Sequence, residues 1–269
     1  MLGTVFKHRG LDITNNSDLH DLVKSFEIEI PRREIGTPNW DLDIVLKALC
    51  KEPFEPLGEA SMRSLTKKTL FLVSLASAKR IGELQSLSTI VAFKERNTGD
   101  AFLQYLPEFL AKTESASKPL PREFIIKSLS AIVGRGEEER YLCPVRALKF
   151  YLKRTKHIPS RTRNLFVSCR DGSKPLSKNA MSFFLRETIK EAHMSQPEAS
   201  YPRGDVRAHS IRGIATSINF LRNKSLQAVL DAATWRGNSI FASNYLKDVR
   251  RTYEHCASLG PIIASGSQI

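Results

Sequence analysis

The stretch "MRSLTKKTLFLVSLASAKRIGELQSL", residues 62–87, sets the predicted centre of the fold. Residues 62–77 are expected to form one long helix, because apolar side chains recur along them at helical spacing. The apolar part, "TLFLVSLASA", is bounded by Lys and Arg and is shorter than the roughly 18 apolar residues of a membrane span. The sequence therefore predicts a core helix, followed by a second helix that begins near Arg80.

Arg80 and Glu83 stand three residues apart at the start of this second helix, so their side chains share one face. The ordinary interpretation is a surface ion pair worth less than ~1 kcal/mol. However, Arg80 directly follows the apolar helix and should emerge at the edge of the core. A guanidinium anchored there by a carboxylate would direct its donors toward a ligand. The pair alone leaves both interpretations open.

The segments on either side of this centre are mostly helical. Further helices are predicted within residues 40–49, 143–155, 177–192, 208–221, 225–234 and 239–255. Short β-leaning segments at 88–93, 101–106, 108–112 and 122–127 predict a small antiparallel sheet, and "LFVS" at 165–168 is a candidate lone strand. Residues 1–35 supply one short helix, capped by Asn or Ser, and the start of a proline-containing linker. The predicted fold class is mainly α with a small antiparallel β-sheet (α+β).

The composition favours a polyanion as partner. The chain has 269 residues, with 41 Lys plus Arg and 28 Asp plus Glu, which gives 41 − 28 = +13. Such a surplus is typical of nucleic-acid binding, although a basic protein without that function is the alternative. The four cysteines are scattered and form no CxxC pair, and the N-terminus has no signal-peptide pattern. We therefore expect a soluble, intracellular protein of one large domain, or of a domain plus a smaller piece.

Common metal, acyl-transfer and nucleotide motifs are missing from the sequence. It contains no HExxH, no GxSxG, no GxxxxGK[ST] and no His/Cys cluster at metal-ligand spacing. We therefore expect no metal and no cofactor.

In "RAHSIRGIATSINF", residues 207–220, His209 and Arg212 again stand three positions apart. Both could address one phosphate: arginine offers a rigid fork of donors, and histidine exchanges a proton near neutral pH. The alternative is a solvated helix face.

Trp235 and Tyr245 form the last candidate pair. A tyrosine has an ordinary pKa of about 10 and attacks a phosphodiester only where cations stabilise its phenolate. The candidate cations upstream would supply that environment. The alternatives are a half-buried helix tyrosine and a tryptophan that anchors the core.

Taken in order, these residues resemble the catalytic string of the tyrosine recombinase (phage integrase) family. Each motif alone is common, whereas the ordered set is specific: Arg80, a lysine of the sheet, His209, Arg212, Trp235 and Tyr245. The spacing from Arg212 to Trp235 is similar to the one that is usual in the family. Tyr245 follows Trp235 at a spacing slightly longer than in the bacterial and phage enzymes, and Tyr253, further along the chain, is the rival nucleophile.

Several longer stretches of sequence resemble the branch of this family that is carried by DIRS-like retrotransposons and Crypton-type elements. Examples are "LASAKRIGELQSLS", "CPVRALKFYLKRT" and "FASNYLKDV". The resemblance covers residues 36–255 as the catalytic domain with its tyrosine recombinase fold. It implies that residues 1–35 are an arm or linker, the remnant of a core-binding domain, and that residues 256–269 are a C-terminal tail.

The resemblance also implies a metal-free, covalent mechanism. Tyr245 would form a 3′-phosphotyrosine, with Arg80 and Arg212 clamping the phosphate and Glu83 orienting Arg80. Lys112, which follows Arg80 in the segment expected to form the sheet, would protonate the leaving 5′-oxygen. The remaining assignments are His209 as acid/base, Trp235 as a phosphate contact, and Lys118 as the alternative lysine.

The implied partner is double-stranded DNA in the nucleus, bound by a homo-oligomer that acts as a tetramer on two duplexes. Lys178, Arg186 and Arg207 are candidate DNA contacts. Besides an active recombinase of a mobile element, two alternatives stay open: a DNA-binding derivative that no longer cleaves, and a topoisomerase with the same phosphotyrosine chemistry. His209 argues against the topoisomerase, because those relatives usually place another basic residue there.

Overall fold

The structure is a computed structural model that describes residues 16–29, 40–93, 99–112, 114, 119, 121–195, 206–221, 229 and 265–268. The chain divides into two units, Met1–Gly36 and Thr37–Ile269. In the first unit, helix α2 (Ser17–Glu29) begins as the sequence predicts, because the Asn16 side chain accepts a hydrogen bond from the Leu19 N–H at 2.9 Å.

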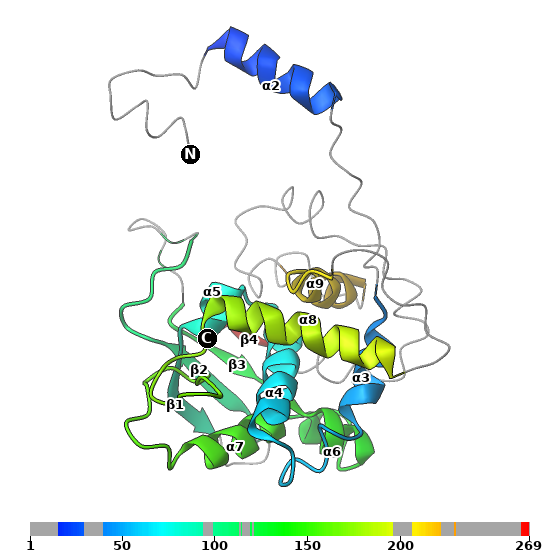
Figure 1. Cartoon of the computed structure of the whole chain (residues 1–269), viewed down its shortest axis with the longest axis vertical. Helices are drawn as coiled ribbons and strands as arrows, with labels where there is room; N and C mark the ends of the chain where they lie inside the picture. The colour runs from blue at the N-terminus through cyan, green and yellow to red at the C-terminus, as the bar shows by residue number, and fades with distance from the viewer. Residues whose placement is uncertain are drawn as a thin grey trace. The chain divides into compact units, whose positions relative to one another are not determined.

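The second unit is mostly helical with a small antiparallel sheet, which confirms the predicted fold class (Figure 1). Its described helices are α3 (Leu42–Leu49), α4 (Met62–Ser77), α5 (Ile81–Gln85), α6 (Glu137–Leu142), α7 (Pro144–Thr155), α8 (Lys178–Met194) and α9 (Ser210–Leu221), with the 3-10 turn η1 (Leu129–Ala131). The strands are β1 (Leu87–Phe93), β2 (Ala101–Tyr105), β3 (Glu123–Ile126) and β4 (Ser265–Gln268), paired in that order. The predicted helices at 225–234 and 239–255 lie outside the described residues.

Helix α4 lies at the centre of the second unit. Ser61 caps it by accepting the Ser64 N–H at 3.0 Å, and all residues from Ser64 to Ser77 are buried. The hydroxyls of Ser74 and Ser77 donate to the carbonyls one helical turn earlier, at 2.6 and 2.7 Å, so polar side chains of α4 are satisfied inside the core. Helices α7, α8 and α9 and strand β3 all contact α4.

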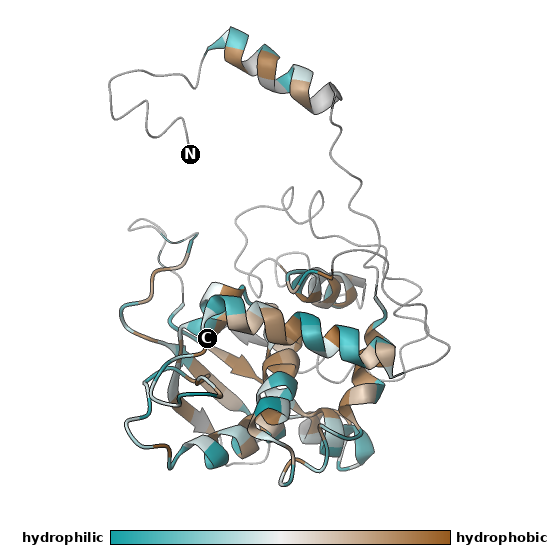
Figure 2. Ribbon diagram, in the orientation of Figure 1, coloured by the Kyte–Doolittle hydropathy of each residue, from teal (hydrophilic) through white to brown (hydrophobic). Residues whose placement is uncertain are grey.

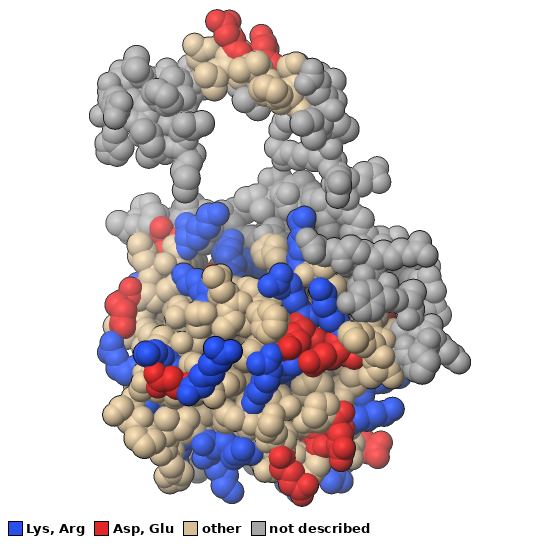
Figure 3. Space-filling model, in the orientation of Figure 1, with Lys and Arg blue, Asp and Glu red and all other residues tan. Residues whose placement is uncertain are grey.

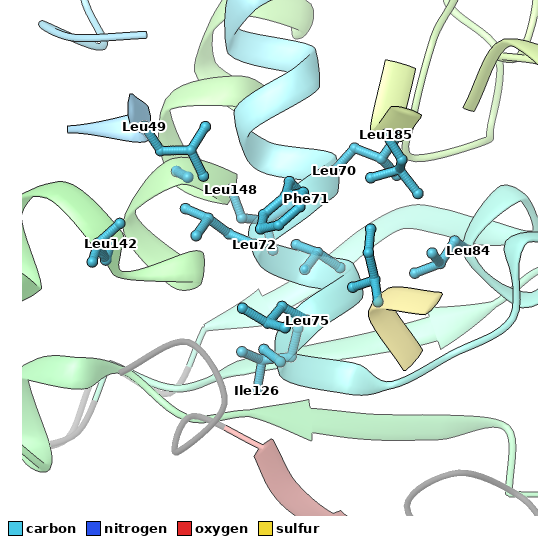
Figure 4. Packing of buried hydrophobic residues seen from close by; sticks show 14 of the residues in the cluster. Leu49, Leu70, Phe71, Leu72, Leu75, Leu84, Ile126, Leu142, Leu148 and Leu185 are labelled. Carbon is cyan, nitrogen blue, oxygen red and sulfur yellow. The ribbon is translucent and has the colours of Figure 1, made fainter. Parts of the chain in front are cut away.

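Large apolar side chains surround α4 on several sides. Figure 4 shows Leu70, Phe71, Leu72 and Leu75 of α4 among buried residues of other elements. Figure 2 shows β2 and β3 largely hydrophobic, whereas α8 alternates between hydrophilic and hydrophobic residues. This alternation fits a helix that covers the core with one face and meets water with the other. No helix within the described part of the chain is long and apolar enough to cross a membrane.

Two predicted β segments are not strands. Residues 108–112 follow and include the end of a turn at residues 107–108, in which the Phe109 N–H donates to the Leu106 carbonyl at 3.0 Å. Pro107 lacks an N–H and cannot continue the ladder of β2. "LFVS" at 165–168 makes one isolated bridge, Val167 with Pro175, and Asn164 just before it makes another, with Ser88. Conversely, residues 256–269, which were expected to be a C-terminal tail, contain strand β4, and this strand pairs with β3.

Helix α4 ends at Ala78, which adopts the left-handed conformation, with φ 52° and ψ 24°. Its N–H donates to the Ser74 carbonyl at 3.0 Å, and its side chain is buried. This C-terminal position usually carries glycine, because a Cβ is disfavoured at positive φ. The turn at Ala78 changes the direction of the chain directly before Lys79 and Arg80.

We expect Ala78→Val to lower the free energy of unfolding by about 2 kcal/mol or more, because a β-branched side chain is strained at positive φ and overpacks this buried site. Ala78→Gly is the matched control. There, relief of the left-handed strain offsets the lost methyl group, and the change should stay within about 1 kcal/mol. Urea denaturation of both variants measures the difference. Equal destabilisation by both would show that the conformation of Ala78 carries no strain.

Candidate active site

Arg80 and Glu83 are joined by backbone and side chain together. Arg80 is the residue before α5, and its N–H donates to Glu83 Oε2 at 2.7 Å. Its guanidinium Nη1 donates to Glu83 Oε1 at 3.2 Å. The Glu83 side chain is 4% exposed and that of Arg80 is 23% exposed, so this is not the open surface pair of the ordinary interpretation. The carboxylate fixes both the start of α5 and the direction of the guanidinium.

Arg212 reaches the same carboxylate from α9. Its Nη1 lies 3.9 Å from Glu83 Oε2, and its side chain is 3% exposed. The alternative interpretation of a solvated helix face is therefore wrong for Arg212. The two arginines lie in distant parts of the sequence, and the fold brings both to Glu83.

The start of α9 is held from outside the helix. Trp40 Nε1 donates to Ser210 Oγ at 2.8 Å, and this hydroxyl donates to the Arg207 carbonyl at 2.6 Å. As a result, α9 begins at Ser210, and His209 lies in the turn before it. The prediction of a helix that already includes His209 is wrong, because the turn hydrogen bonds at Arg207 and Ala208 take the place of the first helical turn.

A hollow that is partly open to solvent brings His209 and Arg212 together with Lys79. Its remaining walls are mostly apolar: Ser74, Ile81, Leu84, Leu185, Ala208 and Ile211. In such surroundings of low polarity, charged groups interact more strongly than they do in water. The described residues that line the hollow include three basic side chains and no carboxylate, which is the composition of an anion site.

Lys79 is a member of the site that the sequence analysis missed. It is 6% exposed, and its Nζ lies 5.0 Å from the centroid of the Phe124 ring. Burial lowers the pKa of Lys79 to about 8; Glu83 opposes this shift, whereas Arg212 and Arg80 add to it. The signal in the sequence was its place beside Arg80, at the end of an apolar helix that delivers both residues to the core edge.

A second hollow, partly open to solvent, is lined by Glu83 itself. Tyr105, Phe109, Ala111 and Glu114 line it with Glu83, Pro121 and Arg122. Burial raises the pKa of the Tyr105 phenol, and Glu83 raises it further. Tyr105 is therefore a neutral phenol at neutral pH rather than an activated nucleophile.

Lys112 directly follows Ala111 in the β2–β3 connection, and its side chain is exposed. The fold thus places Ala111, the residue before Lys112, in the same hollow as Glu83. The role of Lys112 as proton donor stays a prediction. Lys118, Trp235, Tyr245 and Tyr253 lie outside the described residues.

The candidate DNA contacts Lys178, Arg186 and Arg207 are all exposed. Lys178, at the start of α8, lies over α5, because a methyl group added at Gly82 would be 3.8 Å from Lys178 Cε and 3.9 Å from its Nζ. Figure 3 shows Lys and Arg side chains exposed on this face, with acidic side chains between them. Within the described ranges, no three His, Cys, Asp or Glu side chains are grouped as metal ligands.

No protein-family model matches the chain, and no curated protein matches it. Among solved structures, XerA recombinase is similar at 16% identity and a TM-score of 0.43, covering 72% of this chain and 63% of that chain. A lambda integrase tetramer bound to a Holliday junction and a lambda integrase dimer bound to a COC′ core site are similar at 12% identity and a TM-score of 0.43. They cover 78% of this chain, and 47% and 59% of their own. The chain thus spans less than two thirds of each, and likenesses at this level carry no functional conclusion.

We expect Glu83→Gln to lower the free energy of unfolding by about 2–4 kcal/mol, because it leaves buried cations without their shared carboxylate. Glu108→Gln is the matched control. Glu108 pairs with Arg163 at 2.9 Å, but both side chains are more than half exposed, so its loss should change stability by less than ~1 kcal/mol. Urea denaturation at pH 7 compares the two. A Glu83→Gln variant as stable as the control would show that the carboxylate does not hold the site together.

Lys79→Met should stabilise the folded chain by about 1–3 kcal/mol at pH 7. Folding lowers the pKa of Lys79 from an ordinary value of about 10.4 to about 8, so between these values the unfolded chain binds more protons. The free energy of unfolding of the wild type therefore rises with pH across this window, as Lys79 loses its charge in the folded chain. The advantage of Lys79→Met should be largest below pH 8 and nearly gone by about pH 10.

Denaturation curves of the wild type, Lys79→Met and the exposed-site control Lys178→Met at several pH values test this expectation. An advantage of Lys79→Met that does not change with pH would contradict it.

Proposed function

We propose that this chain is a tyrosine-type site-specific recombinase that cleaves and rejoins DNA strands through a covalent 3′-phosphotyrosine, without a metal ion. One observation carries the proposal: the Glu83 carboxylate binds Arg80 at 3.2 Å and lies 3.9 Å from Arg212, next to a hollow that His209 also lines. A phosphodiester under attack gathers negative charge on its non-bridging oxygens, and pre-oriented guanidinium groups stabilise such charge.

The rigidity of this arrangement supports a phosphate clamp rather than a structural ion pair. Arg80 is fixed by α5 and Glu83, and Arg212 by α9, whose start is tied to Trp40. Donors held by several elements need little rearrangement when charge develops, and this preorganisation is where electrostatic catalysis gains its effect.

The proposed reaction balances without a cofactor. The Tyr245 oxygen passes its proton to His209 and attacks the phosphorus, the bond from phosphorus to the 5′-oxygen breaks, and the 5′-oxygen receives a proton from Lys112 or Lys118. His209 assists the proton transfer near the nucleophile, and Trp235 contacts the phosphate. The phosphotyrosine retains the energy of the broken bond, so rejoining to a 5′-hydroxyl is the reverse of these steps.

The proposed substrate is double-stranded DNA. The net charge of +13 supports this, because sequence-independent DNA affinity comes from phosphate contacts by Lys and Arg. Lys178 of α8 also supports a DNA substrate. Its side chain is exposed and lies over Gly82 of α5, the short helix that follows Arg80. Arg186 and Arg207 are further proposed contacts.

Alanine at Lys178, Arg186 or Arg207 should weaken binding to all DNA sequences alike and reduce the salt dependence of that binding.

The biological role is also a proposal. The stretches that resemble DIRS-like and Crypton-type elements support integration of a mobile element in the nucleus, by a homo-oligomer that assembles as a tetramer on two duplexes. Within this proposal, residues 36–255 are the catalytic domain, residues 1–35 are an arm or linker left from a core-binding domain, and residues 256–269 are a C-terminal tail.

The test is trapping of a covalent protein–DNA adduct. Duplexes that carry candidate terminal-repeat junctions and a nick near the cleavage site release a short fragment after cleavage, so rejoining fails and an SDS-resistant adduct accumulates. We expect an adduct with the wild type, and none with Tyr245→Phe, because only the phenolic oxygen forms the bond to phosphorus. Tyr253→Phe is the matched control and should retain it.

The other outcomes each select an alternative. DNA binding without an adduct on any duplex would favour a derivative that binds but no longer cleaves. Relaxation of supercoiled DNA without a sequence requirement would favour a topoisomerase. An adduct lost in Tyr253→Phe instead would move the nucleophile.

A further inference from the structure

Lys79 is a buried cation to which the proposed mechanism gives no task. It stands between the end of α4 and the start of α5, with 6% of its surface exposed. It lines the same hollow as His209 and Arg212, and its Nζ lies 5.0 Å from the Phe124 ring centroid. An ammonium in such a place loses most of its hydration, so it needs a compensating partner.

Lys68, another buried lysine of the core, shows what such compensation looks like. Lys68 Nζ donates to Glu55 Oε1 at 2.5 Å and to the Leu49 carbonyl at 2.7 Å. Its charge is thus neutralised inside the protein. Among the described residues, Lys79 has no comparable contact with a carboxylate.

The carboxylate near Lys79 is already engaged by arginines. Glu83 accepts from the Arg80 N–H at 2.7 Å and from its guanidinium at 3.2 Å, and Arg212 Nη1 lies 3.9 Å away. Glu83 raises the pKa of Lys79, but burial, Arg212 and Arg80 outweigh it. The geometry therefore places a third cation next to two arginines, at an opening whose described walls include no carboxylate.

We propose that Lys79 is a third phosphate-binding cation of this site, with its ammonium contacting an oxygen of the anion held between Arg212 and His209. The proposal rests on the proposed function for its natural ligand, a DNA phosphate. Its physical basis is separate: an anion in the hollow supplies the opposite charge that Lys79 lacks in the free protein.

The proposed contact couples anion binding to a proton. The groups that face Lys79 are Glu83, Arg80, Arg212 and, across the hollow, His209. With the pKa of Lys79 at about 8, much of it is neutral at mildly alkaline pH in the free protein. A bound anion favours the charged form and raises this pKa. Anion affinity should therefore be highest below pH 8 and fall as the pH rises above it.

The first experiment follows the lysine directly. Protein labelled with ¹³C at the lysine Cε is titrated by NMR from about pH 7.5 to 10.5, a range in which ordinary histidines stay neutral. The Lys79 resonance is the one missing from Lys79→Met. Sodium sulfate is the probe, because its charge is constant over this range, and sodium chloride at equal ionic strength is the reference.

We expect the Lys79 midpoint to lie near 8 in chloride and to rise by about one unit or more in sulfate. The Lys68 resonance, from a buried lysine already paired with Glu55, serves as the internal control and should not respond to sulfate. A Lys79 midpoint that is unchanged by sulfate, or that shifts equally with Lys68, would overturn the proposal. All samples use the full chain.

The second experiment uses the covalent adduct with DNA and separates Lys79 from Lys112. Lys79→Met should reduce the rate of adduct formation roughly 10- to 100-fold, as loss of one transition-state contact does. Lys79→Arg should keep most of the rate and lose the pH dependence near 8, because a guanidinium stays charged. A fall in rate that Lys79→Arg does not rescue at any pH would contradict a phosphate contact.

A substrate with sulfur in place of the leaving 5′-oxygen makes the distinction sharper. A thiolate leaves without a proton, so this substrate should rescue a variant that lacks the leaving-group acid, as proposed for Lys112→Met. It should not rescue Lys79→Met, whose defect is in charge stabilisation. Rescue of Lys79→Met would overturn the phosphate-contact role and make Lys79 the proton donor.

The two experiments fail independently. If no DNA yields an adduct with the wild type, the proposed recombinase function fails, while the sulfate titration still decides whether Lys79 binds an anion. If adducts form but sulfate leaves Lys79 unchanged and Lys79→Met cleaves at the wild-type rate, the recombinase function stands and the role of Lys79 falls.

Discussion

The burial of α4 from Ser64 to its end is the constraint on which the rest of the fold depends. A helix that is buried from Ser64 to Ser77 cannot face water on any side, so other elements must cover each of its faces. Helices α7, α8 and α9 and strand β3 provide that cover. The same burial stabilises the C-terminal end of α4. Ala78 keeps its strained left-handed conformation only because the surrounding packing holds it there.

The site follows from this constraint. Since α4 ends inside the core, the residues directly after it emerge at the core edge with little exposure, and Lys79 and Arg80 are those residues. Helix α9 covers another face of α4, which brings Arg212 to Glu83. A single buried carboxylate then organises cations from two distant parts of the chain, and their repulsion is contained by Glu83 and by the rigid start of each helix.

The sequence was sufficient for the elements with strong periodicity and insufficient for contacts over long distances. Helix α4, the start of α5 and three strands of the sheet agree with the predictions, because their patterns are local. The pairing of β4 with β3 had no local signal, since "SGSQ" is polar and lacks β-branched residues. Likewise, spacing alone suggested that Arg80 and Arg212 act together, but only the fold shows that Glu83 joins them and that Lys79 is buried beside them.

The attachment of Trp40 and Asp41 has a mechanical consequence. Trp40 donates to Ser210 at the start of α9, and the Asp41 N–H donates to His193 Nε2 near the end of α8, at 3.0 Å. His193 in turn is anchored through Nδ1 to the Ile189 carbonyl at 2.9 Å. Tension along the chain ahead of Trp40 would therefore be borne first by these two hydrogen bonds, one of which ends within the same helical turn as Arg212. The beginning of the second unit is thus attached directly to the start of the helix that carries an arginine of the site.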